Sequence, residues 1–293
     1  MSPREADPFV AHRNLLFTVA YEMLGSAADA EDVVQETWLR WSAVDQAEVH
    51  EPRAYLVRIV TRQALNRLRT LARRREDYVG EWLPEPLLTA PDVAEDVDLA
   101  ESVSMAMLTV LETLGPTERA VFVLREVFDV PYDEIGTAVG KNTAAVRQIA
   151  LRARNHVAAR RPRMEVDRRE QQVVVEQFLA AVRTGDMQGL LAVLAPDVLL
   201  RADGGGIANA IRKPLAGAEP VARLTSKLSV FAPDADVELA WLNGAPAALI
   251  RAQGELSAIS FGIEDGRITH LYVVRNPHKL TALDSEAVLS REG

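Results

Sequence analysis

Polar and basic residues gather in one short stretch near the middle of the chain, and their types suit contacts with DNA. Arginine can pair with guanine and glutamine with adenine at the edges of the major groove, while lysine or arginine can neutralise phosphate. The candidate residues are Lys141, Asn142, Thr143, Arg147, Gln148 and Arg152. An ordinary helical hairpin with a solvated basic face would contain the same residues, so this stretch alone leaves both interpretations open.

Two short helices joined by a tight turn are predicted to position these side chains. The segment 132–139 has apolar residues at helical spacing, and Gly140 can end it in the left-handed conformation. Asn142 offers a side-chain oxygen that can cap the next helix. That helix has apolar residues on one face, at Val146, Ile149, Ala150, Ala153 and Val157. The pattern is that of a helix-turn-helix, with Leu151 falling on the outward side.

A second basic surface is predicted on a helix that begins at Pro52. Between residues 53 and 75 the chain carries arginines and no acid. The arginines are Arg53, Arg58, Arg62, Arg67, Arg69, Arg73, Arg74 and Arg75. Isolated charges usually indicate no more than solvation, but this concentration suits a polyanion, with an affinity that falls as salt rises.

The net charge of −9 does not exclude nucleic acid as a partner, because the charges are unevenly distributed. The segment 76–101 is acidic and has no base, and it directly follows the arginine-rich helix. A further acidic helix is predicted over 29–41, with Asp29 as its N-cap and acids in the first turn that favour the helix dipole.

Several classes of protein and site are disfavoured by the sequence. Without cysteine the chain has no disulfide and no thiolate metal site, and its five histidines show no metal-binding spacing. We therefore expect no metal and no cofactor. The polar N-terminus does not resemble a signal peptide, and no apolar run is long enough to span a membrane. The expected location is the cytoplasm, with no membrane partner.

The rest of the chain is predicted to contain an acidic linker and a mixed domain. The segment 82–88, WLPEPLL, contains two prolines and is expected to be extended. Its apolar residues favour attachment to a folded surface over a plain spacer. After residue 163 come two helical patterns and several short alternating runs, with hairpin turns at Asn243-Gly244 and Asp265-Gly266. These features indicate an α+β domain.

Two separated motifs give the first half a resemblance to a known family. DAEDVVQETWLRW and PRAYLVRIVTRQALNRLR precede LGPTERAVFVLREVFDVPYDEIGTAVGKNTAAVRQIALRAR. In this order they resemble a bacterial sigma factor of the extracytoplasmic-function (ECF) type, over residues 9–160. WLPEPL, DGGG (203–206) and NPHKL (276–280) resemble the sub-group with a fused C-terminal SnoaL-like domain, a cone-shaped α+β fold. The predicted fold is therefore multidomain, with two all-α domains followed by one α+β domain.

The predicted domain boundaries follow this resemblance. They are 1–80 for sigma region 2, 81–102 for the linker, 103–163 for the helix-turn-helix of region 4, and 164–293 for the SnoaL-like domain. The family's partners are core RNA polymerase, through its beta-prime clamp, and promoter DNA.

The resemblance also implies roles for individual residues. Polymerase binding falls on Asp29, Asp32, Gln35, Glu36 and Leu39. Binding of the minus-ten region falls on Arg58, Arg62, Asn66 and Arg69. Reading of the minus-thirty-five element falls on Lys141, Asn142, Thr143, Arg147, Gln148 and Arg152. Arg62 stands where the family usually has Asn and Asn66 where it has Asp, so the base preference at minus ten does not carry over. Asn142 replaces a usual Ser, and both residues can cap a helix.

The C-terminal domain leaves two functions open. SnoaL-like folds hold a pocket, and some are cyclases or isomerases, so Asp203 could be a catalytic acid of a pocket enzyme fused to a DNA-binding module. We favour a turn role for Asp203, and a structural role for His270. We expect regulation in cis instead, through contacts to the linker or to the first helical domain. The residues expected to make them are Trp82, Pro84, Asp203, Gly204, Gly205, Asn276, Pro277, Lys279 and Leu280. A small-molecule ligand of this domain cannot be named from the sequence, and a DNA-binding regulator that never touches polymerase is the third alternative.

Overall fold

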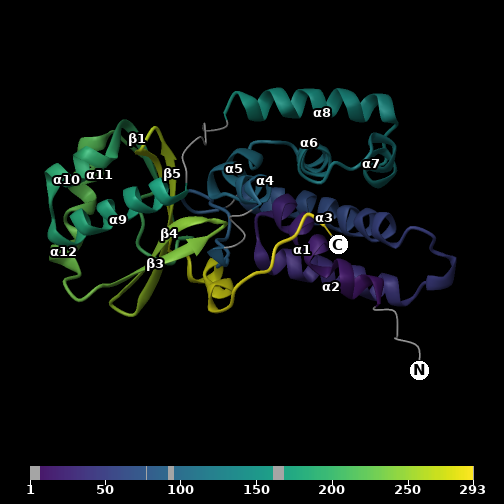
Figure 1. Ribbon diagram of the computed structural model, residues 1–293, viewed down its shortest axis with the longest axis horizontal. Coiled ribbons are helices and arrows are strands. Elements are labelled where there is room, and N and C mark those ends of the chain that lie inside the picture. The colour runs from purple at the N-terminus through teal and green to yellow at the C-terminus, as the bar shows by residue number, and fades with distance from the viewer. Residues whose placement is uncertain (1–6, 77, 92–95, 161–167, 293) are drawn as a thin grey trace. The chain divides into compact units, whose positions relative to one another are not determined.

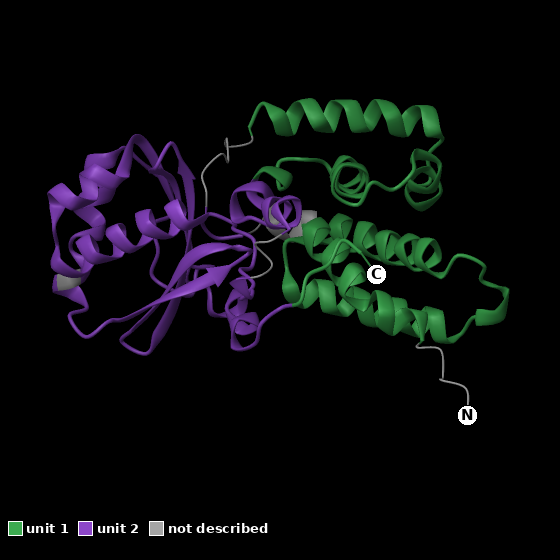
Figure 2. Ribbon diagram, in the orientation of Figure 1, with its two compact units in different colours: residues 1–76, 110–160, 288–293 green, residues 77–109, 161–287 purple. Residues whose placement is uncertain are grey.

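A computed structural model describes residues 7–76, 78–91, 96–160 and 168–292 (Figure 1). The chain forms two compact units, coloured separately in Figure 2. Unit 1 contains residues 1–76, 110–160 and 288–293, and unit 2 contains residues 77–109 and 161–287. The whole of the predicted linker, residues 81–102, therefore groups with the C-terminal part of the chain. None of the helices among the described residues is long and apolar enough to cross a membrane.

Three helices form the N-terminal part of unit 1: α1 (Pro8–Leu24), α2 (Ala27–Ser42) and α3 (Pro52–Glu76), with a short 3-10 turn η1 (Gln46–Glu48) before α3. Gly25 ends α1 in the left-handed conformation, with φ of 66°. The Ser26 hydroxyl then accepts from the Asp29 amide at 3.2 Å, so Ser26 is the N-cap of α2. The predicted cap at Asp29 was wrong, because the helix starts as soon as Gly25 has turned the chain.

The second part of unit 1 is the helix-turn-helix. It contains α6 (Pro116–Phe122), a π-helical segment η3 (Val123–Val127), α7 (Tyr132–Val139) and α8 (Thr143–Ala158). Gly140 ends α7 with φ of 70°, and the Asn142 side chain accepts from the Ala145 amide at 2.8 Å. All five apolar residues predicted to share the inner face of α8 are buried. The predicted helix-turn-helix is therefore confirmed as a structure.

A buried arginine and the end of the chain hold parts of unit 1 together. Arg119 on α6 donates to the Glu22 carbonyl of α1 at 3.0 Å and to the Glu112 carboxylate at 2.7 Å. Burial lowers the pKa of Arg119 to about 9, against the opposing effect of Glu22. Near the C-terminus, the Ser290 amide donates to the hydroxyl of Thr18 on α1 at 3.0 Å.

Unit 2 is built on one six-stranded sheet. The strands are β1 (Leu194–Asp203), β2 (Leu215–Ala216), β3 (Asp236–Leu242), β4 (Ala245–Ala252), β5 (Glu255–Glu264) and β6 (Arg267–Val274). Their order is β2-β1-β6-β5-β4-β3, and β1 runs parallel to β6 while the other neighbours are antiparallel. Asn243-Gly244 and Asp265-Gly266 all have positive φ, as two-residue hairpin turns require. The predicted meander is confirmed.

Helices cover one face of this sheet (Figure 1). They are α9 (Arg168–Thr184), α10 (Met187–Val193), α11 (Ala218–Thr225) and α12 (Leu228–Phe231). Phe178 and Val175 of α9 pack with Leu200 and Leu271 of the strands. The α+β prediction is therefore confirmed, although the sequence analysis identified neither α11 nor the short strand β2.

The linker covers part of the opposite face. Leu83 joins a buried cluster with Leu242 and Tyr272 of the strands. The backbone of the segment continues along β3, because the Asn243 amide donates to the Leu87 carbonyl and the Thr89 amide to the Trp241 carbonyl, both at 2.9 Å. An extended segment attached to a folded surface was predicted here and is confirmed. Beyond it lie two short helices, α4 (Val97–Ser102) and α5 (Met105–Leu111). After β6, two 3-10 turns follow, η4 (Pro277–Lys279) and η5 (Thr281–Asp284).

Candidate nucleic-acid interface and linker node

The outward face of α8 carries the residues predicted to read DNA. Arg147, Gln148 and Arg152 are exposed on the helix, and Lys141 and Asn142 are exposed in the turn before it. Thr143, the first residue of the helix, is half-buried. The six predicted residues therefore lie in the turn before α8 and along residues 143–152 of the helix, outside its buried face.

An aromatic ring stacks with two arginines beside this face. The guanidinium carbon of Arg147 lies 5.6 Å from the ring centroid of Tyr132, and that of Arg125 lies 4.9 Å from it. Arg125 is also paired with Asp129 at 2.7 Å. A cation over an aromatic face is favourable and limits the orientations of the guanidinium. Tyr132 therefore orients Arg147, a role that the sequence analysis did not identify although an aromatic residue began the predicted helix.

The outward side of α3 carries the second basic surface. Arg62, Asn66 and Arg69 are exposed, and Arg58 is half-buried with its guanidinium carbon 5.0 Å from the Tyr55 ring centroid. Arg62 donates to the Thr137 carbonyl of α7 at 2.8 Å. The side chains of residues 72–77, including three of the predicted arginines, lie outside the described residues.

One arginine of α3 is compensated by acids of another helix. Arg67 forms ion pairs with Asp29 and, at 3.4 Å, with Asp32 of α2. The expectation of an uncompensated arginine face was therefore wrong at this position. These acids lie outside the arginine-rich stretch, 38 and 35 residues before Arg67 in the chain, so the local pattern does not contain them.

The face of α2 proposed to meet polymerase is acidic with an apolar end. Asp32, Gln35, Glu36 and Leu39 are exposed, and 62% of Leu39 is accessible. Asp29 differs from them because it is half-buried against Arg67. Glu36 accepts a hydrogen bond from Gln63 of α3 at 2.6 Å.

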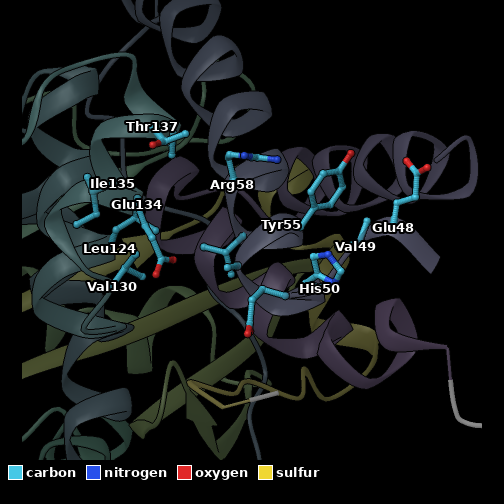
Figure 3. Close-up of a pocket in the computed structure, with 14 residues that line it drawn as sticks. Glu48, Val49, His50, Tyr55, Arg58, Leu124, Val130, Glu134, Ile135 and Thr137 are labelled. Carbon is cyan, nitrogen blue, oxygen red and sulfur yellow. The ribbon is translucent and has the colours of Figure 1, made fainter. Parts of the chain in front are cut away.

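Unit 1 contains a cavity of about 350 Å³ between the start of α3 and the helix-turn-helix (Figure 3). Tyr55 and Arg58 line it on one side, and Leu124, Val130 and Ile135 line it on the other. Its walls are mainly apolar, and the polar side chains among its lining are three glutamates, a histidine, an arginine, a threonine and the tyrosine. An aromatic ring next to an arginine is a combination that stacks well with a nucleic-acid base.

Asp203 is the centre of a buried network in unit 2. It ends β1 and is fully buried. One carboxylate oxygen accepts from Lys279 Nζ at 2.7 Å and from the Leu83 amide at 2.9 Å. The other accepts from the Tyr78 hydroxyl at 2.6 Å and from the Gly205 amide at 3.0 Å. We call this set of five residues, with Asn276, the linker node.

Lys279 also binds the linker, in addition to the contact between Asp203 and the Leu83 amide. Its ammonium donates to the Leu83 carbonyl at 2.6 Å and lies 3.2 Å from the ring centroid of Trp82. The Asn276 amide group donates to the Tyr78 hydroxyl at 2.9 Å. Burial, and then the hydrogen bond to Asp203, raise the pKa of Tyr78, so its hydroxyl keeps the proton that it donates.

Close packing at the node explains why glycine is present at positions 204 and 205. Gly205 has φ of +61°, and a Cβ atom there would meet Asn276 Nδ2 at 2.3 Å. A Cβ at Gly204 would meet the Ala208 carbonyl oxygen at 2.4 Å. Pro277 begins the turn η4, and the following Leu280 is buried in the linker-side cluster. Pro84 of the linker is buried as well.

The node does not have the geometry of a general acid. All hydrogen bonds of Asp203 go to the protein, and no surface of the residue is accessible to a substrate. His270 does not form a catalytic pair with Asp203. In the β1–β6 pairing His270 lies opposite Leu199, which is four residues before Asp203. That offset corresponds to roughly 13 Å along a strand.

His270 is on the sheet face opposite Leu271 and Val273, which pack in the cluster with the covering helices. Its ring stacks with that of Tyr272 at a centroid distance of 5.7 Å. Burial, with Arg201 nearby, lowers the pKa of His270, so the imidazole is neutral at physiological pH.

Comparison with known proteins places this arrangement in a family. Residues 9–74 match the family model Sigma-70 region 2, and residues 104–157 match Sigma-70, region 4. The ECF RNA polymerase sigma factor SigJ of Mycobacterium tuberculosis is 36% identical over 297 residues, which cover 94% of this chain and 93% of the relative. The probable ECF RNA polymerase sigma factor SigI of the same species is 32% identical, with 94% of each chain covered.

A solved structure extends the likeness to the fold of the whole chain. The crystal structure of the M. tuberculosis ECF sigma factor SigJ matches with a TM-score of 0.78 and 34% identity, over 94% of this chain and 98% of that one. The match therefore includes the C-terminal α+β domain. A pocket enzyme carrying a DNA-binding module is not favoured by these relatives. The chain belongs to the extracytoplasmic-function RNA polymerase sigma factors, which bind core RNA polymerase and direct it to promoters.

Proposed function

We propose that this sigma factor reads its promoter at two points and that the linker node controls this activity in cis. The exposed face of α2 binds the beta-prime clamp of core polymerase. The arginine face of α3 binds the melted minus-ten region, and the turn before α8 together with its outward face reads the minus-thirty-five duplex. The C-terminal domain holds the linker that joins the two DNA-binding parts.

The minus-ten assignment is supported by charge and by shape. Arg62, Asn66 and Arg69 follow at helical spacing, so they form one exposed row that can track a phosphate backbone. The cavity beside Tyr55 and Arg58 offers an apolar space for a base that has left the stack. Salt-dependent binding of the melted strand follows from this chemistry.

The observation that carries the cis control is the burial of Asp203 against the linker. The carboxylate binds the backbone of Leu83 directly, and Lys279 binds it from the other side. Detaching the linker from the sheet would break the hydrogen bonds that Leu83 makes with Asp203 and Lys279, and it would expose the Leu83 side chain to water. The C-terminal domain therefore fixes the path of the linker, and through it the freedom of the two DNA-binding parts.

Run-off transcription with core polymerase tests this function. Three chains are compared: the full-length protein, a chain that ends at Arg163, and a chain that lacks only the residues from Asn276 onward. We expect both truncated chains to differ from the full-length protein in transcript yield. Equal activity of all three would contradict control in cis.

Co-purification with core polymerase tests a separate part of the proposal, namely that the exposed face of α2 binds the polymerase. Changing Asp32 or Gln35 to alanine is expected to weaken co-purification, because both side chains are exposed on the proposed docking face. If both variants bind core polymerase like the unchanged protein, the α2 face is not the docking surface, whatever the truncations show.

A further inference from the structure

Leu151 is an apolar residue in the middle of a polar recognition surface. It lies on α8 with 49% of its surface accessible, whereas the other aliphatic residues of that helix larger than alanine are buried. The core of the helix-turn-helix is complete without it. Single exposed apolar residues are common on protein surfaces, so what distinguishes this leucine is its place among the residues proposed to read DNA.

Helical geometry puts Leu151 in line with the base-reading residues. It follows Gln148 by three positions and Arg147 by four, so the three side chains share one face. It also follows the exposed Ala144 by seven positions, which is roughly 10 Å along the axis. A helix with its side chains is about 10–12 Å across and fits the major groove, which is about 12 Å wide, so this row can lie along the base edges.

Among the groups that base pairs present in the major groove, one is apolar and therefore matches a leucine side chain. The edges of the base pairs present hydrogen-bond donors and acceptors, apart from the C5 methyl group of thymine. An isobutyl side chain gains nothing from a donor or an acceptor, but it gains from burying a methyl group. The neighbouring Arg147, Gln148 and Arg152 would hold the helix in the groove while Leu151 makes this contact.

We propose that Leu151 is a specificity-determining residue that contacts a thymine methyl group in the minus-thirty-five element, next to the bases read by Arg147 and Gln148. This inference rests on the proposed reading of that element by α8. It adds a preference for thymine that hydrogen-bonding residues alone would not give.

The test first obtains the element and then removes single methyl groups. Full-length protein with core polymerase selects active promoters from a library randomised in the upstream element. Each thymine of the selected element is then replaced by deoxyuridine, which lacks only the methyl group. Promoter binding is measured for the unchanged protein and for Leu151→Ala.

We expect one deoxyuridine position to weaken binding by the unchanged protein about fourfold, which corresponds to about 0.8 kcal/mol for one buried methyl or methylene group. Leu151→Ala should bind the thymine promoter less tightly and should be indifferent to deoxyuridine at that position. Leu224→Ala removes another exposed leucine, on α11 of unit 2, and should behave like the unchanged protein.

Two outcomes overturn the inference, and they are distinguishable. If Arg147→Ala lowers promoter binding but no deoxyuridine position separates Leu151→Ala from the unchanged protein, Leu151 does not read thymine. If neither Arg147→Ala nor Gln148→Ala affects promoter binding, then α8 does not read the element and the proposed function of this helix fails as well.

Discussion

Replacing Lys279 with methionine removes the cation of the linker node and nearly keeps its volume. The carboxylate of Asp203 then stays in a site with no accessible surface, since the side chains of the pair are 0% and 4% exposed. Removing one partner of a buried ion pair typically costs about 3–5 kcal/mol. Three donors remain on the carboxylate, so we expect the lower end, about 3 kcal/mol.

This cost should appear as release of the linker, because release lets water reach Asp203. Hydrogen exchange of the Leu83 amide reports on that step directly, since this amide donates to Asp203 at 2.9 Å. An energy of about 3 kcal/mol corresponds to roughly a hundredfold faster exchange when exchange follows the opening equilibrium. Urea unfolding measures the same loss globally, as a lower midpoint.

Two further variants make the result interpretable. Lys213→Met removes an exposed lysine of the same unit and should leave both measurements unchanged. Asp203→Asn combined with Lys279→Met removes both charges and should recover part of the loss, because the uncompensated charge is gone. If Lys279→Met changes stability by less than about 1 kcal/mol and leaves Leu83 exchange unchanged, the node does not hold the linker as argued.

Three other predictions follow from the geometry. Arg147→Ala should lower run-off transcription by about 5- to 150-fold, because a bidentate base contact is worth about 1–3 kcal/mol, while co-purification with core polymerase stays unchanged; a loss of core binding would contradict this role. Gly205→Ala should destabilise unit 2 more than Gly254→Ala, measured by thermal unfolding, because both have positive φ but only the first Cβ would collide, with Asn276; equal effects would show that the close contact is relieved at no cost. Folding lowers the pKa of His270 from its usual value of 6.5. Below pH 6.5 the imidazole is therefore protonated more readily in the unfolded chain than in the folded one. Because the unfolded chain binds more protons there, the free energy of unfolding falls as the pH falls. The urea midpoint of His270→Gln should therefore depend less on pH between about 5 and 7 than that of the unchanged protein, and identical slopes would refute the shift.

Local features of the fold were predictable because their causes lie within a few residues. The end of α7 at Gly140 and the cap of α8 at Asn142 depend on backbone freedom and on one side-chain oxygen. The hairpin turns at Asn243-Gly244 and Asp265-Gly266 have the same local origin. The predicted start of α2 was wrong because a neighbouring helix sets it. The helix α1 ends at Gly25, so the next residue, Ser26, becomes the cap of α2.

The ion pairs of α2 and α3 illustrate the limit of local reasoning. The arginines of α3 lack acids within their own stretch, and the sequence analysis left them uncompensated. Packing of the two helices places Asp29 beside Arg67, so part of the basic surface is neutralised by a residue that the linear pattern did not connect with it. Charge along the chain therefore overestimated the charge on the surface.

The sequence by itself determined the helix-turn-helix, the α+β class of the C-terminal domain and the extended linker, because periodicity and turn chemistry act over short distances. The family resemblance led us to expect contacts between Asp203 and the linker or first helical domain, but only the tertiary structure decided which groups the carboxylate binds. Its partners Leu83 and Lys279 are 120 and 76 residues away in the chain, and no local pattern relates them. A buried carboxylate needs several donors at once, and only the folded sheet, with the linker laid across it, brings those donors together.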